Sequence, residues 1–583
     1  MKKILLTAIN AKYIHSNPAV YNLKACAGEY ADAIEIAEYT INHRSEYILQ
    51  EIYKKRPDVL CFSCYIWNYD YVREIAAEFH KLRKEVPIWV GGPEVSYETK
   101  KMFAENPAFY GVMIGEGEAA FSGLAEYYCS GKEMELKSLA GIAFREESEA
   151  DGICYTAPRP PMDLNQVPFT YSDMDVFQNR IIYYESSRGC PFSCSYCLSS
   201  IDKRLRFRET DTVKKEISFF IEKEVPQVKF VDRTFNCNHT HAMEIWKFIK
   251  AKDRGITNFH FEIAADLLSE EELTLLSELR PGLIQLEIGV QSTNPATIEE
   301  IHRTMRLTKL FSAVKKIQKA GNIHLHLDLI AGLPFEDFER FAQSFRDIYA
   351  LKPNQLQLGF LKVLKGSYMY ENRTKYGIIC RDRPPYEVMQ TNWLSYDEIL
   401  SIKLVEEMLE VYYNSGQFEV TMKLVDAAYR DSFDFFLELG RFYEKNGYLD
   451  QNHSRIRRSE LLLEFFTKDQ KMPVDLVKES LLFDLYYREN MKSRPFWAKN
   501  PAEFSKITKL FCKNGKLSHI EPFFFHFPKK EEKAVSALPK KLPECIYVLF
   551  EYEKRDALSH QAKTTEITGL EVKEKWENAQ MKF

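Results

Sequence analysis

The stretch Ser187-Arg188-Gly189-Cys190-Pro191-Phe192-Ser193-Cys194-Ser195-Tyr196-Cys197 brings three cysteines together at C-x3-C-x2-C spacing. It directly follows an apolar run, 181–186, that predicts a buried strand. Thiolates at this spacing favour an iron–sulfur cluster or zinc. Zinc usually takes a fourth Cys or His, and residues 198–236 contain neither. We therefore expect Cys190, Cys194 and Cys197 to hold a [4Fe–4S] cluster with one iron left open.

The region around this loop has the rhythm of a parallel barrel. Apolar runs alternate with long amphipathic segments such as 212–223 and 308–320, which predict helices. Six successive units predict a partial (β/α)6 barrel over residues 181–370, with functional side chains at the carboxyl ends of the strands. The predicted strands are 181–186, 227–231, 260–264, 283–289, 324–330 and 355–361.

Residues 1–135 show a second strand–helix alternation. Its apolar runs are short and its helical segments, such as 69–82 and 119–129, are amphipathic. This pattern predicts a Rossmann-like, doubly wound parallel sheet, whose ligands bind outside the carboxyl ends of the strands. Two of the predicted strands end in glycine turns, Gly91-Gly92-Pro93-Glu94 and Gly115-Glu116-Gly117-Glu118.

The remaining segments separate and follow these two domains. Residues 136–180 include the proline-rich run 157–161, which predicts an extended linker. Residues 371–583 have helical periodicity at 396–413 and 459–466, a strand-like run at 544–551 and an aromatic run at 523–528. We expect a mostly helical C-terminal domain, with the aromatic run buried.

Composition excludes several classes of protein. The 583 residues are 45% hydrophobic and carry a net charge of −5, so they offer no overall basic field for nucleic acid, which leaves only a local basic groove as a way to bind it. No apolar run is long enough to span a membrane. The twelve cysteines lack the dense spacing of a secreted disulfide scaffold and suit a reducing cytoplasm.

The cysteine loop, with an aromatic residue before its third cysteine, resembles the signature of radical S-adenosylmethionine (SAM) enzymes. The resemblance covers the predicted barrel. It implies that the open iron binds the amino and carboxylate groups of SAM. Reductive cleavage then gives methionine and a 5′-deoxyadenosyl radical. The reaction implies an electron donor such as flavodoxin or ferredoxin.

The same resemblance suggests which strand ends contact SAM. The segments 230–236, 286–292 and 327–334 match those near the cofactor amino group, ribose and adenine. His324 and His326 alternate on one strand face, where buried core histidines are expected. The implied SAM-binding residues are Tyr196, Asp232, Gln291, Ser292 and Gly332.

The N-terminal domain resembles the cobalamin-binding domains that precede the barrel in some radical enzymes. The glycine turns and the domain order carry this resemblance. The Asp-x-His-x-x-Gly motif, which supplies an axial histidine in many cobalamin proteins, is absent after the first strand, and His15 is not its substitute. Residues 371–583 resemble the uncharacterised extension of one branch of these enzymes. The implied cobalamin contacts are Ser63, Tyr65, Gly91, Gly92, Gly115 and Glu116.

Several functions remain open from the sequence. A chain with both cofactors would transfer a methyl group or rearrange its substrate, which could be a small molecule or a macromolecule. A chain that has lost cobalamin would modify RNA or a tetrapyrrole. A third alternative is a cobalamin- or redox-responsive binding protein with a structural cluster. If both cofactors serve one substrate, the glycine turns must face the cysteine loop across a shared cavity.

Overall fold

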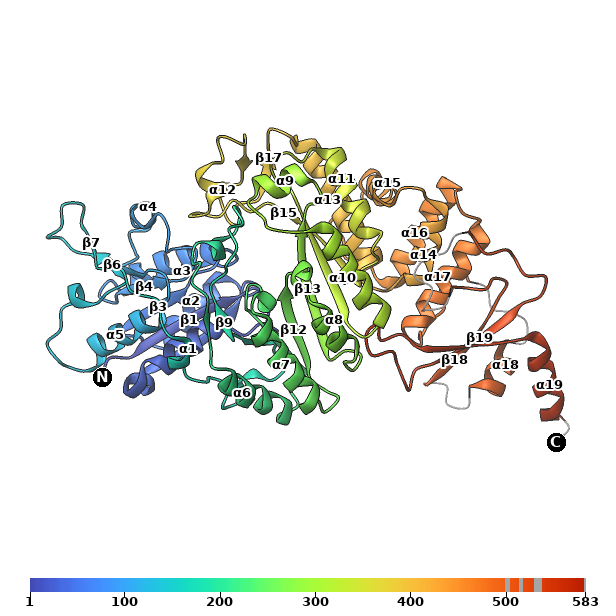
Figure 1. Cartoon of the computed structure of the whole chain (residues 1–583), viewed down its shortest axis with the longest axis horizontal. Helices are drawn as coiled ribbons and strands as arrows, with labels where there is room; N and C mark the ends of the chain where they lie inside the picture. Colours follow the sequence, from blue (N-terminus) through green and yellow to red (C-terminus); the bar gives the residue numbers. More distant parts are fainter. Residues whose placement is uncertain (499–503, 513–516, 529–536, 581–583) are drawn as a thin grey trace.

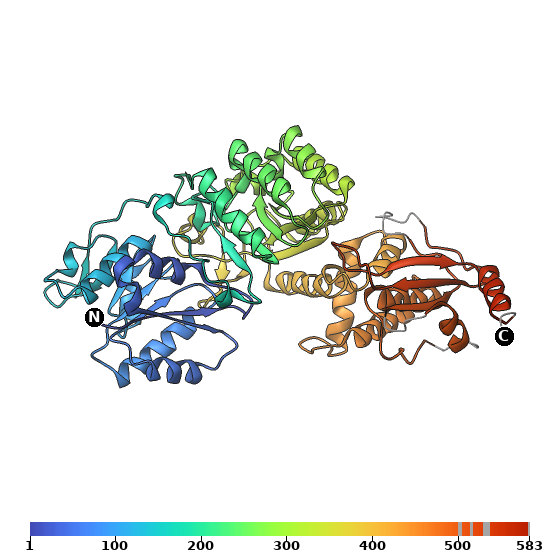
Figure 2. The same ribbon diagram turned by 90° about the horizontal axis from the view of Figure 1, so that it is seen from below.

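The chain forms three units arranged in a row (Figure 1). The computed structural model describes residues 1–498, 504–512, 517–528 and 537–580. A view turned by 90° places the N-terminal and C-terminal units at opposite ends, with the central unit between them (Figure 2). The central unit therefore contacts both of its neighbours.

The N-terminal unit is built on a seven-stranded sheet of order β2-β1-β3-β4-β5-β6-β7. Strands β1 to β5 are parallel, whereas β6 and β7 join the edge antiparallel. The strands are β1 (Ile4–Asn10), β2 (Ile34–Thr40), β3 (Val59–Ser63), β4 (Ile88–Gly91), β5 (Gly111–Met113), β6 (Ile142–Arg145) and β7 (Ile153–Tyr155).

Helices cover both faces of this sheet. Buried residues of α2 (Ser45–Lys54), α3 (Tyr69–Leu82) and α4 (Thr99–Glu105) belong to one apolar core. Those of α1 (Pro18–Cys26) and α5 (Glu118–Cys129) belong to the core on the other face. The parallel part of the unit is therefore doubly wound.

The segment expected to be a linker differs from that expectation in its first part. Residues 136–180 supply β6 and β7, which lie on the sheet and extend it beyond residue 135. Only the part after β7 crosses to the central unit, and it contains the proline-rich run. The alternation of apolar side chains in such short edge strands is too brief to stand out in the sequence.

The central unit is a partial barrel of six parallel strands, of order β15-β14-β13-β12-β11-β8. Each strand is followed by helical structure packed outside. The strands are β8 (Ile182–Tyr184), β11 (Gln227–Phe230), β12 (Asn258–Ile263), β13 (Ile284–Gln291), β14 (His324–Ala331) and β15 (Gln355–Phe360). The helices are α6 (Thr210–Glu222), α7 (His239–Lys252), α8 (Glu270–Ser277), α9 (Pro295–Glu300), α10 (Leu307–Ala320) and α11 (Phe338–Tyr349).

Strand β13 shows how the barrel sorts its side chains. Burial alternates strictly along it: Leu286, Ile288 and Val290 are fully buried in the apolar core. Because successive residues of a strand point to opposite faces, Glu287 and Gln291 point to the barrel interior. The interior at this level is therefore polar.

The C-terminal unit is mostly helical, as expected, and includes a small antiparallel sheet of β18 (Ser518–Phe523), β19 (Ile546–Glu551) and β20 (Lys563–Ile567). In the aromatic run, Phe523, Phe525 and Phe527 are buried. No helix among the described residues has the length and apolarity to cross a membrane. The helices are α12 (Tyr368–Glu371), α13 (Tyr396–Leu409), α14 (Glu419–Ala428), α15 (Ser432–Lys445), α16 (Arg455–Asp469), α17 (Val474–Arg488), α18 (Phe504–Phe511) and α19 (Gly569–Gln580).

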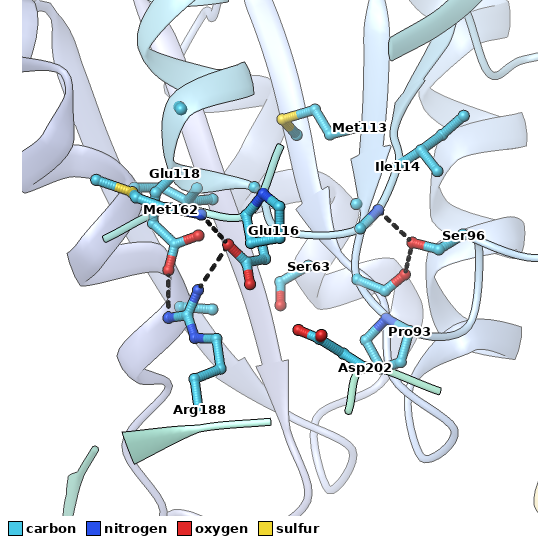
Figure 3. Close-up of a pocket in the computed structure, with 18 of the residues that line it drawn as sticks. Ser63, Pro93, Ser96, Met113, Ile114, Glu116, Glu118, Met162, Arg188 and Asp202 are labelled. Atoms are coloured by element: carbon cyan, nitrogen blue, oxygen red, sulfur yellow. Dashed lines mark hydrogen bonds and ion pairs between the residues drawn. The ribbon is translucent and has the colours of Figure 1, made fainter. Parts of the chain in front are cut away.

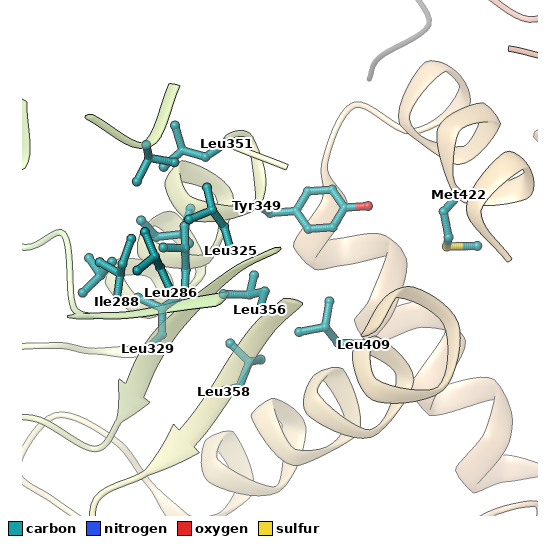
Figure 4. Close-up of a cluster of buried hydrophobic side chains, with 14 of the residues drawn as sticks. Leu286, Ile288, Leu325, Leu329, Tyr349, Leu351, Leu356, Leu358, Leu409 and Met422 are labelled. Carbon is teal, nitrogen blue, oxygen red and sulfur yellow. The ribbon is translucent and has the colours of Figure 1, made fainter. Parts of the chain in front are cut away.

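One apolar core runs from the barrel into the C-terminal unit. Leu356 and Leu358 of β15 belong to the same buried group as Leu409 of α13 and Met422 of α14. Figure 4 shows these side chains between the barrel strands and the helices. Burial of a shared apolar surface fixes the C-terminal unit against the outside of the barrel.

Candidate functional site

The cysteine loop projects from the barrel between two short paired strands, β9 (Ser187–Arg188) and β10 (Arg206–Phe207). Gly189 has a φ of +96°, and a Cβ there would lie 2.4 Å from the Arg204 carbonyl oxygen, so the bend requires glycine. The backbone N–H of Cys190 donates to the carbonyl oxygen of Asp202 at 3.1 Å. Local backbone contacts thus define how the cysteines are presented.

All three cysteines line a cavity of about 190 Å³ on the barrel, here called the barrel cavity. Their thiols are free, and no further cysteine or histidine lines this cavity. Cys190 and Cys194 are each 8% exposed. Three free thiols from one loop on one cavity fit a four-iron cluster with three protein ligands.

Arg303 is a functional candidate that the motifs did not reveal. Its Nη1 lies 3.6 Å from Cys194 Sγ and donates to the Tyr196 hydroxyl at 3.3 Å. Its Nη2 donates to the carbonyl oxygen of Gly289 on β13. The Arg303 guanidinium therefore places a permanent positive charge beside the cysteine loop.

Three carboxylates of the barrel strands also line the barrel cavity: Glu262 of β12, Glu287 of β13 and Asp328 of β14. We call them the acidic floor. Glu262 and Glu287 are partners in the parallel register of their strands. Lys229 Nζ of β11 lies 2.9 Å from Glu287 Oε2.

The floor carboxylates have very different pKa values. Burial, reinforced by the neighbouring Glu287, raises the pKa of Glu262 to about 7. Burial also acts to raise the pKa of Glu287, but contacts with His260 and Lys229 outweigh it and lower that pKa to about 2. His260 Nε2 lies 3.0 Å from Glu287 Oε2. Glu262 is therefore the floor carboxylate whose charge is least compensated.

Two of the predicted SAM residues line the barrel cavity. Tyr196 does so next to Arg303. Gln291 ends β13 with a φ of +73°, and its buried Oε1 has no hydrogen-bond partner. Both side chains thus face the space beside the cysteines.

The other three predicted SAM residues do not line either of the cavities described here. Asp232 is buried and accepts hydrogen bonds from the hydroxyls of Ser186 and Ser187, at 2.7 and 2.5 Å. Ser292 donates to the buried Glu336 at 2.6 Å.

Gly332 packs on the short strand β17 (Val388–Gln390), where a Cβ would lie 2.7 Å from Val388 Cγ1. Asp232, Ser292 and Gly332 thus have close protein neighbours in the folded chain. Residue type and strand position suggested a cofactor contact, but the partners of these groups depend on tertiary packing.

A signal for the acidic floor was present in the sequence. Polar and charged residues recur at every second position of otherwise apolar strands, as in Gln285-x-Glu287 and His324-x-His326-x-Asp328. Such alternation in a barrel strand marks residues that face the interior. Applied to all six strands, it would have identified Glu262, Glu287 and Asp328.

A larger cavity, of about 600 Å³, lies between the N-terminal unit and the barrel. We call it the interdomain cavity (Figure 3). All six predicted cobalamin contacts line it, from Ser63 and Tyr65 to the two glycine turns. Leu198 and Ser199, which follow the cysteines, line it from the other side.

The walls of the interdomain cavity suit a flat ring. Gly115, at a φ of +78°, has nothing within 4 Å of where a Cβ would be, so that position is open. At Gly92 a Cβ would lie 2.5 Å from the Cys64 carbonyl oxygen. No histidine lines the cavity. The residues fit cobalamin held without an axial histidine from the protein.

Glu116, one of the predicted contacts, is engaged by protein groups. It lies 2.6 Å from Arg206 and 3.5 Å from Arg188, and accepts a hydrogen bond from the Met162 backbone N–H at 2.9 Å. Arg188, two residues before the first cysteine, also pairs with Glu118 at 2.7 Å. These ion pairs join the glycine turn to the cysteine loop, as Figure 3 shows for Arg188.

The carboxyl ends of the strands in the N-terminal sheet and in the barrel face each other, as expected. Ser199 and Arg233 line both the interdomain cavity and the barrel cavity, so the two spaces adjoin. A further tie lies on the outer side, where Glu94 is 3.0 Å from Lys365 Nζ and accepts from the Tyr386 hydroxyl. The two units are thus held with their strand carboxyl ends facing.

Comparison with protein families matches each unit separately. Residues 4–125 match the B12 binding domain, and residues 184–348 match the radical SAM superfamily. Residues 374–538 match a protein family of unknown function (DUF4080). The first two matches cover the two sides of the interdomain cavity.

Curated relatives match about half of this chain. TokK of Streptomyces tokunonensis, a cobalamin-dependent radical SAM methyltransferase, is 27% identical over 306 residues, which cover 50% of this chain and 44% of TokK. The chain is a cobalamin-dependent radical SAM enzyme. An uncharacterised methyltransferase of Pyrococcus horikoshii, PH0819, is 24% identical to this enzyme over 335 residues, 55% of this chain and 69% of its own length.

A solved structure has the same fold. OxsB, a cobalamin-dependent SAM radical enzyme determined with aqua-cobalamin and SAM bound, superposes with a TM-score of 0.56 at 14% identity. The match covers 83% of this chain and 79% of OxsB. At this identity the likeness concerns the fold of the cobalamin-dependent radical SAM enzyme.

Proposed function

We propose that this enzyme cleaves SAM and, with cobalamin, transfers a methyl group to a carbon atom of its substrate. The observation that carries the proposal is the pair of adjoining cavities. One contains the three free thiols and the other contains the glycine turns of the B12-type unit. A single substrate at their junction would be within reach of both cofactors.

The cofactors would sit on separate residues. Cys190, Cys194 and Cys197 would hold the four-iron cluster, and the turns 91–93 and 115–117 would hold cobalamin. When bound, these groups supply an electron for the cleavage of SAM and a site that carries a methyl group.

The chain itself supplies charge and position. Arg303 places a permanent positive charge beside Cys194. Arg188 links the cysteine loop to Glu118 at the start of α5, so the two cofactor sites keep a fixed relation.

The chemistry also suggests an electron donor and a cellular compartment. SAM cleavage requires one-electron reduction, for which we propose a donor such as flavodoxin or ferredoxin. The twelve cysteines form no disulfide among themselves. Free thiols in this number suit a reducing compartment, and we propose the cytoplasm.

Anaerobic reconstitution tests the proposal. The protein is purified with cobalamin supplied and its cluster rebuilt, and then it is reduced in the presence of SAM. We expect the absorption spectrum of bound cobalamin before reduction and 5′-deoxyadenosine, measured by mass spectrometry, after it. A Cys237→Ala variant serves as the control, because Cys237 lines neither cavity.

Two results would contradict the proposal. Protein that retains the cluster but yields no 5′-deoxyadenosine would rule out SAM cleavage and favour a structural cluster. Protein that cleaves SAM but takes up no cobalamin would rule out methyl transfer through cobalamin.

A further inference from the structure

The C-terminal unit contains a cavity of about 640 Å³, bounded by α17, the aromatic run and β20, which we call the C-terminal groove. None of the described residues that line it lines the barrel cavity or the interdomain cavity. The unit that holds the groove stands at the opposite end of the molecule from the N-terminal unit (Figure 2). Cluster and cobalamin binding therefore do not explain this space.

Buried aromatic side chains form the floor of the C-terminal groove. Phe483 and Tyr487 of α17 and Phe527 of the aromatic run line it, and each is between 7% and 9% exposed. The centroid of the Phe483 ring lies 5.1 Å from that of Phe527 and 5.3 Å from that of Tyr487. Rings packed this closely give a fixed apolar surface for the side chains of a ligand.

One side of the groove is the outer edge of the C-terminal sheet. The strand order is β18-β19-β20, so β20 is an edge strand with β19 as its neighbour. Four consecutive residues of β20, 563–566, line the groove. Because successive residues of a strand point to opposite faces, a space that touches all four of them follows the edge of the strand.

This edge is open to a further strand. In the part of the chain that the structure describes, the backbone of β20 pairs with β19 and with no other segment. Every second residue of an edge strand directs its N–H and C=O groups away from its neighbour. An added strand lies about 4.8 Å from the strand it joins, which is the position of the groove beside β20.

The cations of the groove are weakly compensated. Lys554, Arg555 and Lys563 line it. Among the described residues, Arg555 donates to two backbone carbonyl oxygens, at 2.6 and 2.9 Å, and no hydrogen bond or ion pair reaches Lys554. The Nζ of Lys563 is 3.5 Å from Glu551, but the lysine side chain is 69% exposed, so this pair is weak.

The two carboxylates of the groove, in contrast, already have donors. Asp556 accepts hydrogen bonds from the backbone N–H groups of Leu558 and Ser559, at 3.0 and 2.8 Å. The Nδ1 of His526 lies 3.1 Å from Glu566 Oε2. The charges left to contact a ligand are therefore positive, and they favour an acidic ligand.

We propose that the C-terminal groove binds an extended, acidic peptide segment of a partner protein, which pairs with β20 as a fourth strand of the sheet. Hydrogen bonds to the open edge hold the peptide backbone, and its alternate side chains pack on the aromatic floor. Its carboxylates pair with Lys554, Arg555 and Lys563. The inference goes beyond the proposed function and does not depend on it.

A peptide of designed sequence tests the proposal without knowledge of the partner. Its eight residues alternate valine and glutamate, and a fluorescein label reports its binding to the full-length protein by anisotropy. A matched peptide alternates valine and lysine. At pH 8 and low salt we expect the glutamate peptide to bind at least about tenfold more tightly, and added salt should weaken its binding.

Hydrogen exchange locates the bound peptide. Saturation with the glutamate peptide should slow exchange of the amides in β20 by at least about tenfold, because those that face the groove then form hydrogen bonds. Strand β2 is the matched control, since it is an edge strand of the N-terminal sheet. Exchange in β2 should not change.

Charge variants assign the binding to the lysines of the groove. Lys554→Glu combined with Lys563→Glu should lower the affinity for the glutamate peptide by at least about tenfold and raise that for the lysine peptide. Lys445→Glu combined with Lys468→Glu is the matched control, because these exposed lysines lie on α15 and α16, outside the groove. Circular dichroism of each variant shows that the C-terminal unit is folded.

Three results would overturn the inference. Equal affinity of the wild-type protein for the two peptides, or none for the glutamate peptide, would mean that the groove does not select an acidic segment. Binding without slower exchange in β20 would place the peptide elsewhere. A dimer in light scattering that Lys554→Glu/Lys563→Glu abolishes, with slow exchange in β20 before any peptide is added, would assign the edge to a second copy of this chain.

Discussion

Replacing Glu262 with glutamine should stabilise the protein at high pH and leave it unchanged at low pH. Burial raises the pKa of this carboxyl from 4.5 to about 7. The folded state thus holds the proton more tightly than the unfolded state does. Ionisation of Glu262 therefore opposes folding, and its effect grows as the pH rises from 4.5 to 7 and is constant above that.

The expected magnitude follows from the pKa. Each tenfold change in proton affinity is worth about 1.4 kcal/mol, so full ionisation of Glu262 costs the folded state roughly 3 kcal/mol. Other charged groups around the floor keep their places in the variant: Lys229, Arg233, His260, Glu287, His326 and Asp328. Glutamine has nearly the same shape and no charge. It should therefore recover most of this free energy at pH 8 and almost none at pH 5.

Local opening is the suitable measurement, because a chain with several domains does not have one free energy of unfolding. Hydrogen exchange of peptides from β12, resolved by mass spectrometry at pH 5 to 8 and corrected for intrinsic rates, gives the local free energy. Glu271→Gln should show no pH trend of this kind, because Glu271 is mainly exposed. An advantage of Glu262→Gln that is as large at pH 5 as at pH 8 would refute the reasoning.

Three further predictions concern the loops around the two cavities. Combined replacement of the loop cysteines by alanine should abolish iron binding, and iron analysis that still finds about four irons per chain would exclude the loop as the ligand set. Gly92→Ala should destabilise the N-terminal unit by more than about 2 kcal/mol, because φ is +113° and the Cβ overlaps a carbonyl oxygen. Gly131→Ala, which meets no atom within 4 Å, should cost only about 1 kcal/mol; equal losses in thermal denaturation would contradict the steric argument. Arg188→Gln leaves the buried Glu118 without this partner and should weaken the contact between the units by about 3 kcal/mol, seen as faster proteolysis between 156 and 181. The exposed Arg204→Gln should change cleavage little, and similar cleavage of both variants would speak against the tie.

Local sequence patterns were sufficient for the parts of the fold that depend on local periodicity. The six barrel strands and the parallel part of the first sheet follow from apolar runs between amphipathic helices. Strands β6 and β7 could not be predicted in this way, because three or four residues show too little alternation of apolar and polar side chains. Their antiparallel pairing also depends on the edge of a sheet that the rest of the unit must form first.

The residues of the site also fall into those that local sequence predicts and those that only tertiary contacts bring together. The cysteine spacing identifies a loop because ligands close in sequence are close in space. Asp232 stays a predicted SAM contact: an acid at a strand end suggested it, whereas the hydrogen bonds that two neighbouring serines donate to it follow from tertiary packing. Arg303 reaches Cys194 across more than a hundred residues of sequence, a contact that only the closed barrel creates.

The segment that leaves the last barrel strand has a practical consequence for anyone who divides this chain. Lys365 and Tyr386 both reach Glu94, next to the glycine turn of the first unit. The following helix α13 shares the apolar core of the barrel. A fragment that ended at residue 370, where the barrel was expected to stop, would lack Tyr386 and expose the apolar side of β15. The smallest piece that preserves the relation between the two cavities must therefore extend through α13.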